Sequence, residues 1–415
     1  MPLAPAAGTS NPRFPLFDSL RALAALSVFA FHVAFFGGLL DDRALAPYLA
    51  QLNVGVPLFF LISAFLLYRP FAQARHAGSR SPALVPYAVR RALRIYPAYW
   101  VALVIIAAAL GLSQVFDPGG AVRYFALLQI YDSGTIVGGI GQAWTLAVEV
   151  SFYAVLPLWA LLMRRLPART TRGFLATELA GLALLFAAGL AWKLATLDAG
   201  AGGELRFTPE MVVLPAFLDH FALGMALAVL SVALAGRPER RGALALLDRA
   251  PWLPWALAAI AFVAAGSVGD GVGSASGEVV RHELRGLVGL GLLLPAVFGA
   301  PERGAVRRLL GRPWLLWLGL VSYGFYLYSP AIMDGLVRLG AVDTLGAAGL
   351  GLVAVPLSVA AAAASFYLLE RHALRLGRRL SHRRRSQDAD RRAEDLHERA
   401  AGGPMAISAD VDSGS

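Results

Sequence analysis

Long, almost uncharged apolar blocks recur along the whole chain, and they constrain its fold more than any other feature. Each block holds roughly 18–25 residues, the length that an α-helix needs to cross the ~30 Å hydrocarbon core of a bilayer. Hydrophobic residues make up 57% of the 415 residues and charged residues only 15%, against ~45–50% and ~25% in soluble proteins. We therefore expect an all-α integral membrane protein, a bundle of about ten transmembrane helices.

The blocks divide the chain into an N-terminal segment (1–16), a membrane domain (17–370) and a basic tail (371–415). The tail mixes acidic and basic residues and cannot form a hydrophobic core, so it is expected to be largely disordered. A further apolar segment, 121–131, is too short to cross and is expected to be interfacial or re-entrant. The expected spans are 17–38, 52–69, 96–113, 143–163, 173–195, 211–235, 251–268, 282–300, 314–338 and 344–369.

Arginine is distributed unevenly between the loops. The loops after the second, fourth, sixth and eighth expected spans are rich in arginine, whereas the alternate loops are mainly acidic. Arginine-rich loops stay in the cytoplasm, so both termini are expected to be cytoplasmic. The net charge of +10 then reflects loops held against anionic membrane lipid, and no nucleic-acid partner is expected.

The first expected span contains three ionisable residues, Asp18, Arg21 and His32. Arg21 and His32 are eleven residues apart, so they share one helix face and lie about 16 Å apart along the axis. Asp18 lies one turn from Arg21 on that face. Because an ionisable group inside a membrane costs roughly 2.5–3.5 kcal/mol, these residues are functional candidates. The alternative is that Arg21 extends to the interface and His32 only bonds a neighbouring helix.

The fourth expected span contains Glu149, with Thr145 and Tyr153 one turn away on either side. A carboxylate at this depth needs a partner, and His32 lies at a comparable depth in the first span. We predict a His32–Glu149 pair in which the carboxylate orients the imidazole as a general base. The alternative is an ion pair that only holds two helices together.

Arginines also cluster at the cytoplasmic start of the third expected span, in YAVRRALRIYPAYW. Arg91 and Arg94 are neighbours on a helix, with Arg90 alongside. Guanidinium groups at a membrane entrance are suited to binding phosphate. Plain cytoplasmic anchoring is the alternative for any one of them.

Other polar residues of the spans are weaker candidates, and the tyrosines in particular fit aromatic packing as well as substrate binding. Without cysteine or a histidine cluster, no metal site is expected. The candidate substrate contacts are Asp18, Ser63, Trp144, Thr145, Tyr153, Tyr323 and Tyr326.

Six stretches, in this order, resemble the acyltransferase family 3 membrane proteins, bacterial O-acyltransferases that modify envelope glycans, lipids and some antibiotics. The resemblance covers nearly all of residues 17–370. The stretches are FDSLRALAALSVFAFH, GVPLFFLISAFLLYRP, RRALRIYPAYW, AWTLAVEVSFYAVLPL, FALGMALA and LGLVSYGFYLYSP.

The resemblance implies a multi-pass enzyme of the bacterial cytoplasmic membrane that takes acyl-CoA, usually acetyl-CoA, from the cytoplasm and binds no cofactor. The family's Arg-x10-His motif falls on Arg21 and His32, its RxxR motif on Arg91 and Arg94, and its acidic motif on Glu149. Arg21, Arg91 and Arg94 are thereby expected to bind acyl-CoA, and His32 and Glu149 to be catalytic.

Two positions depart from the family pattern. Ala64 replaces the glycine of a Ser-Gly-Phe motif, and Ser329 replaces a histidine after Tyr328. The second change keeps a catalytically inactive relative among the alternatives.

The expected function is transfer of an acyl group, in the first place acetyl, from acyl-CoA to a hydroxyl of an envelope glycan, a lipid-linked sugar or a secondary metabolite. A multi-pass transporter or flippase for an anionic substrate is the alternative from another class, because intramembrane Arg, His and Glu also line ion paths.

Overall fold

The computed structural model describes residues 14–168, 170–196, 208–235, 242–268, 275–299 and 303–380. These residues form helices and no strand, which confirms the predicted all-α fold. The long helices are α1 (Phe17–Phe36), α3 (Gly55–His76), α4 (Leu84–Leu110), α6 (Trp144–Arg165), α7 (Thr171–Thr196), α9 (Leu218–Ala233), α11 (Leu253–Ser267), α12 (Ala275–Val297), α14 (Pro313–Arg338) and α15 (Ala341–Ser365).

Short elements connect the long helices. They are η1 (Leu39–Asp41), α2 (Ala46–Leu49), η2 (Ala50–Val54), η3 (Ser113–Val115), α5 (Pro118–Phe125), η4 (Gln129–Tyr131), η5 (Gly141–Ala143), α8 (Pro209–Val212), η6 (Leu214–Phe217), α10 (Ala243–Arg249), α13 (Ala305–Leu310) and the π-helical turn η7 (Phe366–Glu370). The expected interfacial segment falls on α5 and η4, and α5 is only 8 residues long.

Each of the ten expected spans coincides with a long helix, but only eight helical segments of the described chain are long and apolar enough to cross a membrane. Helix α11 has 15 residues, which is short for a ~30 Å core. Helix α12 carries Glu278, Arg281, Glu283 and Arg285 in its first half. The structure thus supports a multi-pass membrane protein, and the count of ten and the orientation remain predictions.

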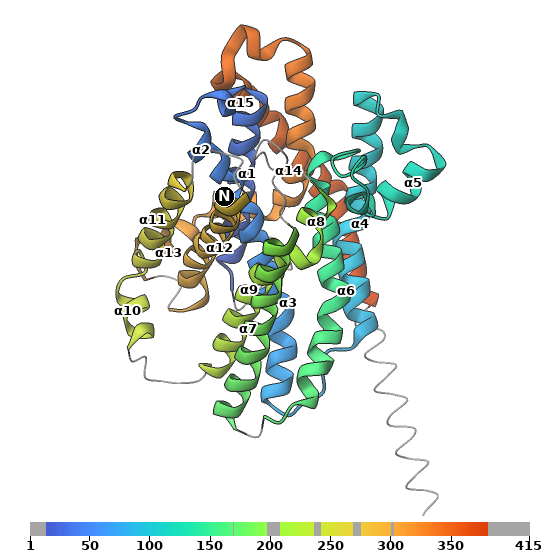
Figure 1. The fold of residues 1–415 in the computed structure, drawn as a ribbon. Helices are drawn as coiled ribbons and strands as arrows, with labels where there is room; N and C mark the ends of the chain where they lie inside the picture. Colours follow the sequence, from blue (N-terminus) through green and yellow to red (C-terminus); the bar gives the residue numbers. More distant parts are fainter. Residues whose placement is uncertain are drawn as a thin grey trace, which may run out of the picture.

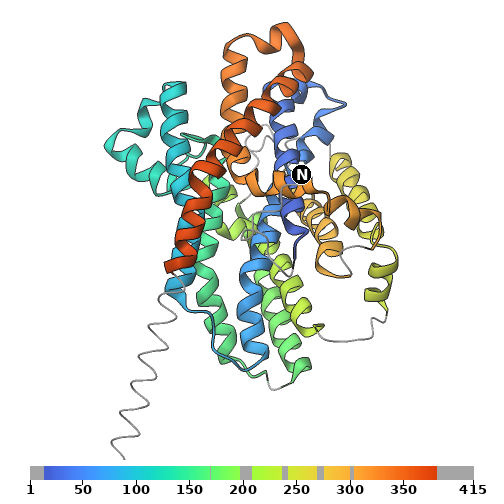
Figure 2. The same ribbon diagram turned by 180° about the vertical axis from the view of Figure 1, so that it is seen from behind.

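Helix α3 is central in the bundle and packs on α1, α6, α9 and α12, while α14 packs between α1 and α15. Figures 1 and 2 show α3, α6, α7 and α9 side by side in the lower half, with the α14–α15 hairpin rising at the top. Small residues allow these close approaches, as is usual between membrane helices.

Two glycines mark the closest crossings of α3. A Cβ on Gly55 would collide with the backbone of Ala24 in α1, and one on Gly224 of α9 would meet Leu61 and Ala64. Ala64 is completely buried. The close α3–α9 contact therefore persists despite the alanine, because the glycine lies on the facing helix.

The last long helix does not stop at the predicted domain boundary. It continues through η7 to Leu380, so the first ten residues of the predicted disordered tail are helical. The remaining tail, 381–415, and the segment 1–13 lie outside the described residues.

Candidate active site

Five arginines converge on one open cavity, which we call the arginine vestibule. They come from the start of α1, the first half of α4 and the helix that follows η7, and they are Arg21, Arg90, Arg91, Arg94 and Arg378. Asp18 is the one acidic residue in the lining, and its Oδ1 lies 2.7 Å from Nη1 of Arg21. The lining therefore has a strong excess of positive charge, which is suited to a polyanion such as a phosphate group.

A second cavity, the inner chamber, adjoins the arginine vestibule. Arg21, Leu66, Leu67, Arg91 and Arg94 line both cavities. The chamber extends along α3 from Leu67 to Val56, and its remaining polar lining consists of Ser63, Thr145, Glu149, Tyr153, Ser322, Tyr323 and Tyr326. The structure thus brings most of the predicted site residues together around these two adjoining cavities.

Among the described residues, Glu149 is the only acidic one that lines the inner chamber. Its Oε1 accepts hydrogen bonds from the Ser63 hydroxyl of α3 and from the Tyr153 hydroxyl, the latter at 2.5 Å. Tyr153 lies one helical turn beyond Glu149 in α6, as the sequence spacing predicted. The guanidinium carbon of Arg91 lies 5.9 Å from the centre of the Tyr153 ring. This arrangement connects the carboxyl group to the cationic entrance.

The hydroxyls on the α14 wall of the chamber are bonded to protein atoms. Tyr323 donates to the Ile95 carbonyl at 2.9 Å, and Tyr326 donates to the Gln142 carbonyl at 2.9 Å. The Thr145 hydroxyl lies 2.7 Å from that of Tyr326. These bonds hold α14 against α4 and α6, so the tyrosines build the chamber wall and present their rings to its interior.

His32 and Glu149 do not form the predicted pair. His32 Nδ1 lies 2.9 Å from the Val28 carbonyl, whereas the hydrogen bonds of Glu149 go to Ser63 and Tyr153. His32 is not among the residues that line the inner chamber.

Helix α3, which carries the Glu149 partner Ser63, begins against α1 one turn before His32. Gly55 packs on α1 against Ala24 and Val28, between Arg21 and His32 along the helix. The two residues do share one face of α1, but at different levels of the bundle.

Two further residues lie elsewhere than expected. Trp144 lines a separate cavity, although its neighbour Thr145 lines the inner chamber. Arg378 lies in the predicted disordered tail but lines the arginine vestibule. Arg371, Arg375 and Arg378 recur at helical spacing, and this periodicity was the available signal that the last helix continues.

The acyltransferase domain family matches residues 15–368, which is most of the chain and includes every site residue described above except Arg378. This chain belongs to that family. Membership confirms the predicted resemblance and identifies the protein as an acyltransferase, and not as an aminoacyltransferase.

The curated proteins that are similar to the chain include the following three. Acyltransferase MdmB of Streptomyces mycarofaciens is 33% identical over 38% of this chain and 42% of its own length. The exopolysaccharide production protein ExoZ of Rhizobium meliloti is 27% identical over 78% of this chain and 90% of its own length. Peptidoglycan O-acetyltransferase OatA of Listeria monocytogenes is 26% identical over 37% of this chain and 25% of its own length.

The chain thus spans less than half of MdmB and a quarter of OatA, but nearly the full length of ExoZ. No solved structure shows a significant match.

Proposed function

We propose that this acyltransferase moves an acyl group, in the first place acetyl, from cytoplasmic acyl-CoA to a hydroxyl of an envelope glycan, a lipid-linked sugar or a secondary metabolite. The observation that carries the proposal is the inner chamber, where Arg21, Arg91 and Arg94 share one lining with Glu149, beside the arginine vestibule. The names of OatA and ExoZ refer to peptidoglycan and exopolysaccharide, which favours a glycan acceptor. The bacterial cytoplasmic membrane is the proposed location, with both termini inside.

The donor is proposed to enter through the arginine vestibule. Arg91 and Arg94 line both cavities, together with Arg21, which supports the proposal that they hold the phosphates of CoA. From Leu67 to Val56 the inner chamber follows α3 for eleven residues, a rise of about 16 Å. A flexible pantetheine arm is long enough to carry its thioester into such a space.

Glu149 is the proposed general base in the inner chamber. Its carboxylate would take the proton of the acceptor hydroxyl as that oxygen attacks the thioester carbonyl. The new C–O bond forms, the C–S bond breaks, and the proton passes from Glu149 to the departing CoA thiolate. Ser63 and Tyr153, which hold the carboxylate through hydrogen bonds, would fix its orientation, and no bound cofactor takes part.

His32 is proposed as a second proton-transfer group. A carbonyl oxygen can only accept, so the contact with Val28 requires the proton on Nδ1, which leaves Nε2 with its lone pair in neutral imidazole. His32 would reach the thioester only if the first turn of α3 moved away from α1. Under that condition it could deprotonate the acceptor or carry the acyl group itself.

Release of CoA thiol tests the function directly. Purified protein is incubated with acetyl-CoA and membrane extract as the acceptor source, and free thiol is measured; the chain contributes no thiol because it has no cysteine. Acyl transfer predicts thiol release that depends on the extract. A transporter or an inactive relative predicts no release, and that result would refute the proposal. The Glu149→Gln variant is the matched control for contaminating hydrolases.

A further inference from the structure

A third cavity lies at the opposite end of α3 from the arginine vestibule, and we call it the outer cavity. It is bounded by the first turns of α3, α6 and α12, the end of α7 and the α8–α9 segment. Its polar lining includes Asn53, Lys193, Glu210, Glu278, His282 and Arg285. The proposed acyl transfer uses the arginine vestibule and the inner chamber but not the outer cavity.

The outer cavity is bordered by an unusual concentration of charge for a membrane bundle. The Lys193 ammonium contacts Asp219 and lies 3.1 Å from Glu283, and Arg285 lies 2.6 Å from Glu278. Lys193 is the one lysine of the chain. Ionisable groups gathered inside the helical bundle of a membrane protein are by default candidates for a functional site.

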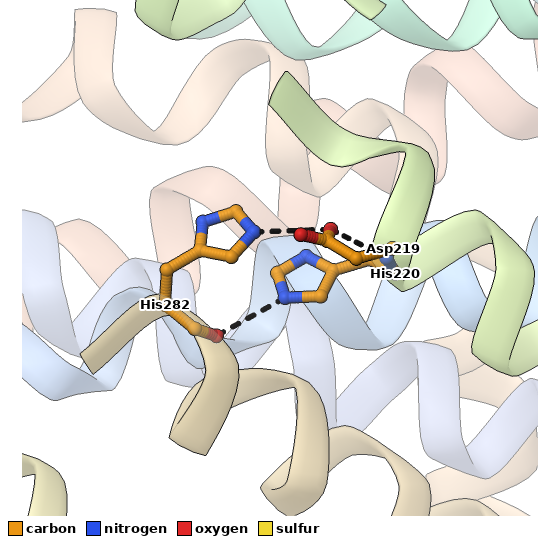
Figure 3. A group of neighbouring side chains, drawn as sticks. All are labelled: Asp219, His220 and His282. Atoms are coloured by element: carbon orange, nitrogen blue, oxygen red, sulfur yellow. Dashed lines mark hydrogen bonds and ion pairs between the residues drawn. The ribbon is translucent and has the colours of Figure 1, made fainter. Parts of the chain in front are cut away.

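Asp219, His220 and His282 lie close enough together, and are of the right residue types, to bind a metal ion. Their geometry argues against a metal site. Figure 3 shows the rings of His220 and His282 face to face, with Asp219 beside them. The ring centres are 4.0 Å apart and the planes differ by 6°, so the in-plane nitrogen lone pairs lie in parallel planes and do not converge. The Lys193 ammonium also contacts the Asp219 carboxylate, where it would repel a metal cation.

The cluster instead orients polar groups around the outer cavity. His282 Nε2 lies 3.2 Å from Asp219 Oδ1, and His220 Nε2 donates to the His282 carbonyl at 3.1 Å. His220 is completely buried, lines the cavity, and has no hydrogen-bond partner for Nδ1 among the described residues. Asn53 likewise makes no side-chain hydrogen bond within the described part of the chain. Unused polar groups of this kind are available to a ligand.

The lining indicates the chemistry of that ligand. The arginine vestibule is almost purely cationic, whereas the outer cavity combines acidic, basic and amide groups in one small space. Such a mixture offers the ligand both hydrogen-bond donors and acceptors, and it does not favour a ligand with a net charge. Trp144 and Phe217 add aromatic surface, with ring centres 5.7 Å apart. Aromatic faces next to mixed hydrogen-bonding groups fit an uncharged molecule with many hydroxyls, that is, a sugar unit.

The outer cavity also lies next to the inner chamber. Val56 lines both spaces, and Trp144 and Thr145 are consecutive residues that line one space each. A thin wall of side chains at the start of α3 therefore separates a polyhydroxyl-type site from the end of the donor path. Only the side chains of this wall would have to move for a hydroxyl bound in the outer cavity to reach the thioester.

Given the proposed acyl transfer, on which this inference rests, we infer that the outer cavity binds the sugar unit whose hydroxyl accepts the acyl group. Donor and acceptor then approach along α3 from different sides and meet in the inner chamber at Glu149.

The test uses two variants that break no internal side-chain contact of the cluster, Asn53→Ala and Glu210→Gln. Glu210 is exposed at the cavity rim. The matched control is Asp117→Asn, an exposed acidic residue in another loop. Each full-length protein is returned to a strain that lacks the gene. Mass spectrometry then measures the rate at which acylated product accumulates after induction, and calorimetry measures acetyl-CoA binding to the purified protein.

We expect a three- to tenfold slower accumulation for each variant, the effect of about one hydrogen bond, and a tenfold or larger loss in the double variant. Acetyl-CoA affinity should stay within twofold of wild type, the control should match wild type, and fragmentation should place the acyl group on a sugar hydroxyl.

Wild-type rates in both variants, a parallel loss of acetyl-CoA affinity, or an acyl group on a molecule without a sugar would overturn the inference. A wild-type protein that forms no acylated product and binds no acetyl-CoA would instead refute the proposed function itself.

Discussion

Replacement of Glu149 by glutamine distinguishes a catalytic role of this residue from a purely structural one. Both hydrogen bonds, from Ser63 and Tyr153, go to the same oxygen, Oε1. An amide oxygen in that position can accept both bonds, so Glu149→Gln removes the charge and the basicity but keeps the contacts.

The expected effects on stability and activity differ widely. Exchanging a charged for a neutral acceptor weakens each bond by about 1 kcal/mol, and the smaller desolvation cost of the amide offsets part of this. The free energy of unfolding should fall by no more than about 2 kcal/mol. Loss of a general base slows transfer by about 10²- to 10⁴-fold, which corresponds to about 3–5 kcal/mol of activation free energy.

The assay is the initial rate of CoA thiol release with acceptor present, combined with thermal unfolding in detergent. Glu149→Ala is the structural control: it leaves the Ser63 and Tyr153 hydroxyls without their acceptor, at a cost of about 1–3 kcal/mol each, so it should lower both activity and melting temperature. Transfer by Glu149→Gln within a few-fold of wild type would refute the general-base assignment. A melting temperature as low as that of Glu149→Ala would show that the carboxylate is mainly structural.

Three further predictions concern the donor, the second base and the topology. Arg94→Ala should weaken acetyl-CoA binding about 10- to 100-fold, the value of a charge-assisted bond, whereas exposed Arg80→Ala should not; equal losses by calorimetry would mean that both arginines serve topology. His32→Ala should slow transfer at least 100-fold without unfolding the protein. Because no hydrogen bond joins His32 to Glu149, the losses should multiply when His32→Ala is combined with Glu149→Gln. A double variant no slower than either single variant would indicate that the two residues act as a direct pair. Leu339, 83% exposed between α14 and α15, is predicted to face outward, so Leu339→Cys in this cysteine-free chain should react with an impermeant maleimide in intact cells; reaction only after lysis would invert the predicted orientation.

The sequence alone was sufficient to predict the fold class and the positions of the helices. Hydropathy and the 3.6-residue period are properties of neighbouring residues, so α1, α6 and α14 lie where the apolar blocks predicted them. The same local rule placed Tyr153 beside Glu149 and put Arg91 and Arg94 at one entrance.

The tertiary structure decided which helices meet and at what depth. A helical period fixes the face of a residue but not the helix opposite it, and membrane helices choose their partners through packing of small residues, without a hydrophobic driving force between them. Gly55 allows α3 to pack on α1 between Arg21 and His32. His32 does not line the inner chamber, and Ser63 of α3 is the partner of Glu149. The outer cavity likewise exists only because Asn53, Lys193 and the start of α12 come together from distant parts of the chain, a convergence that no local pattern encodes.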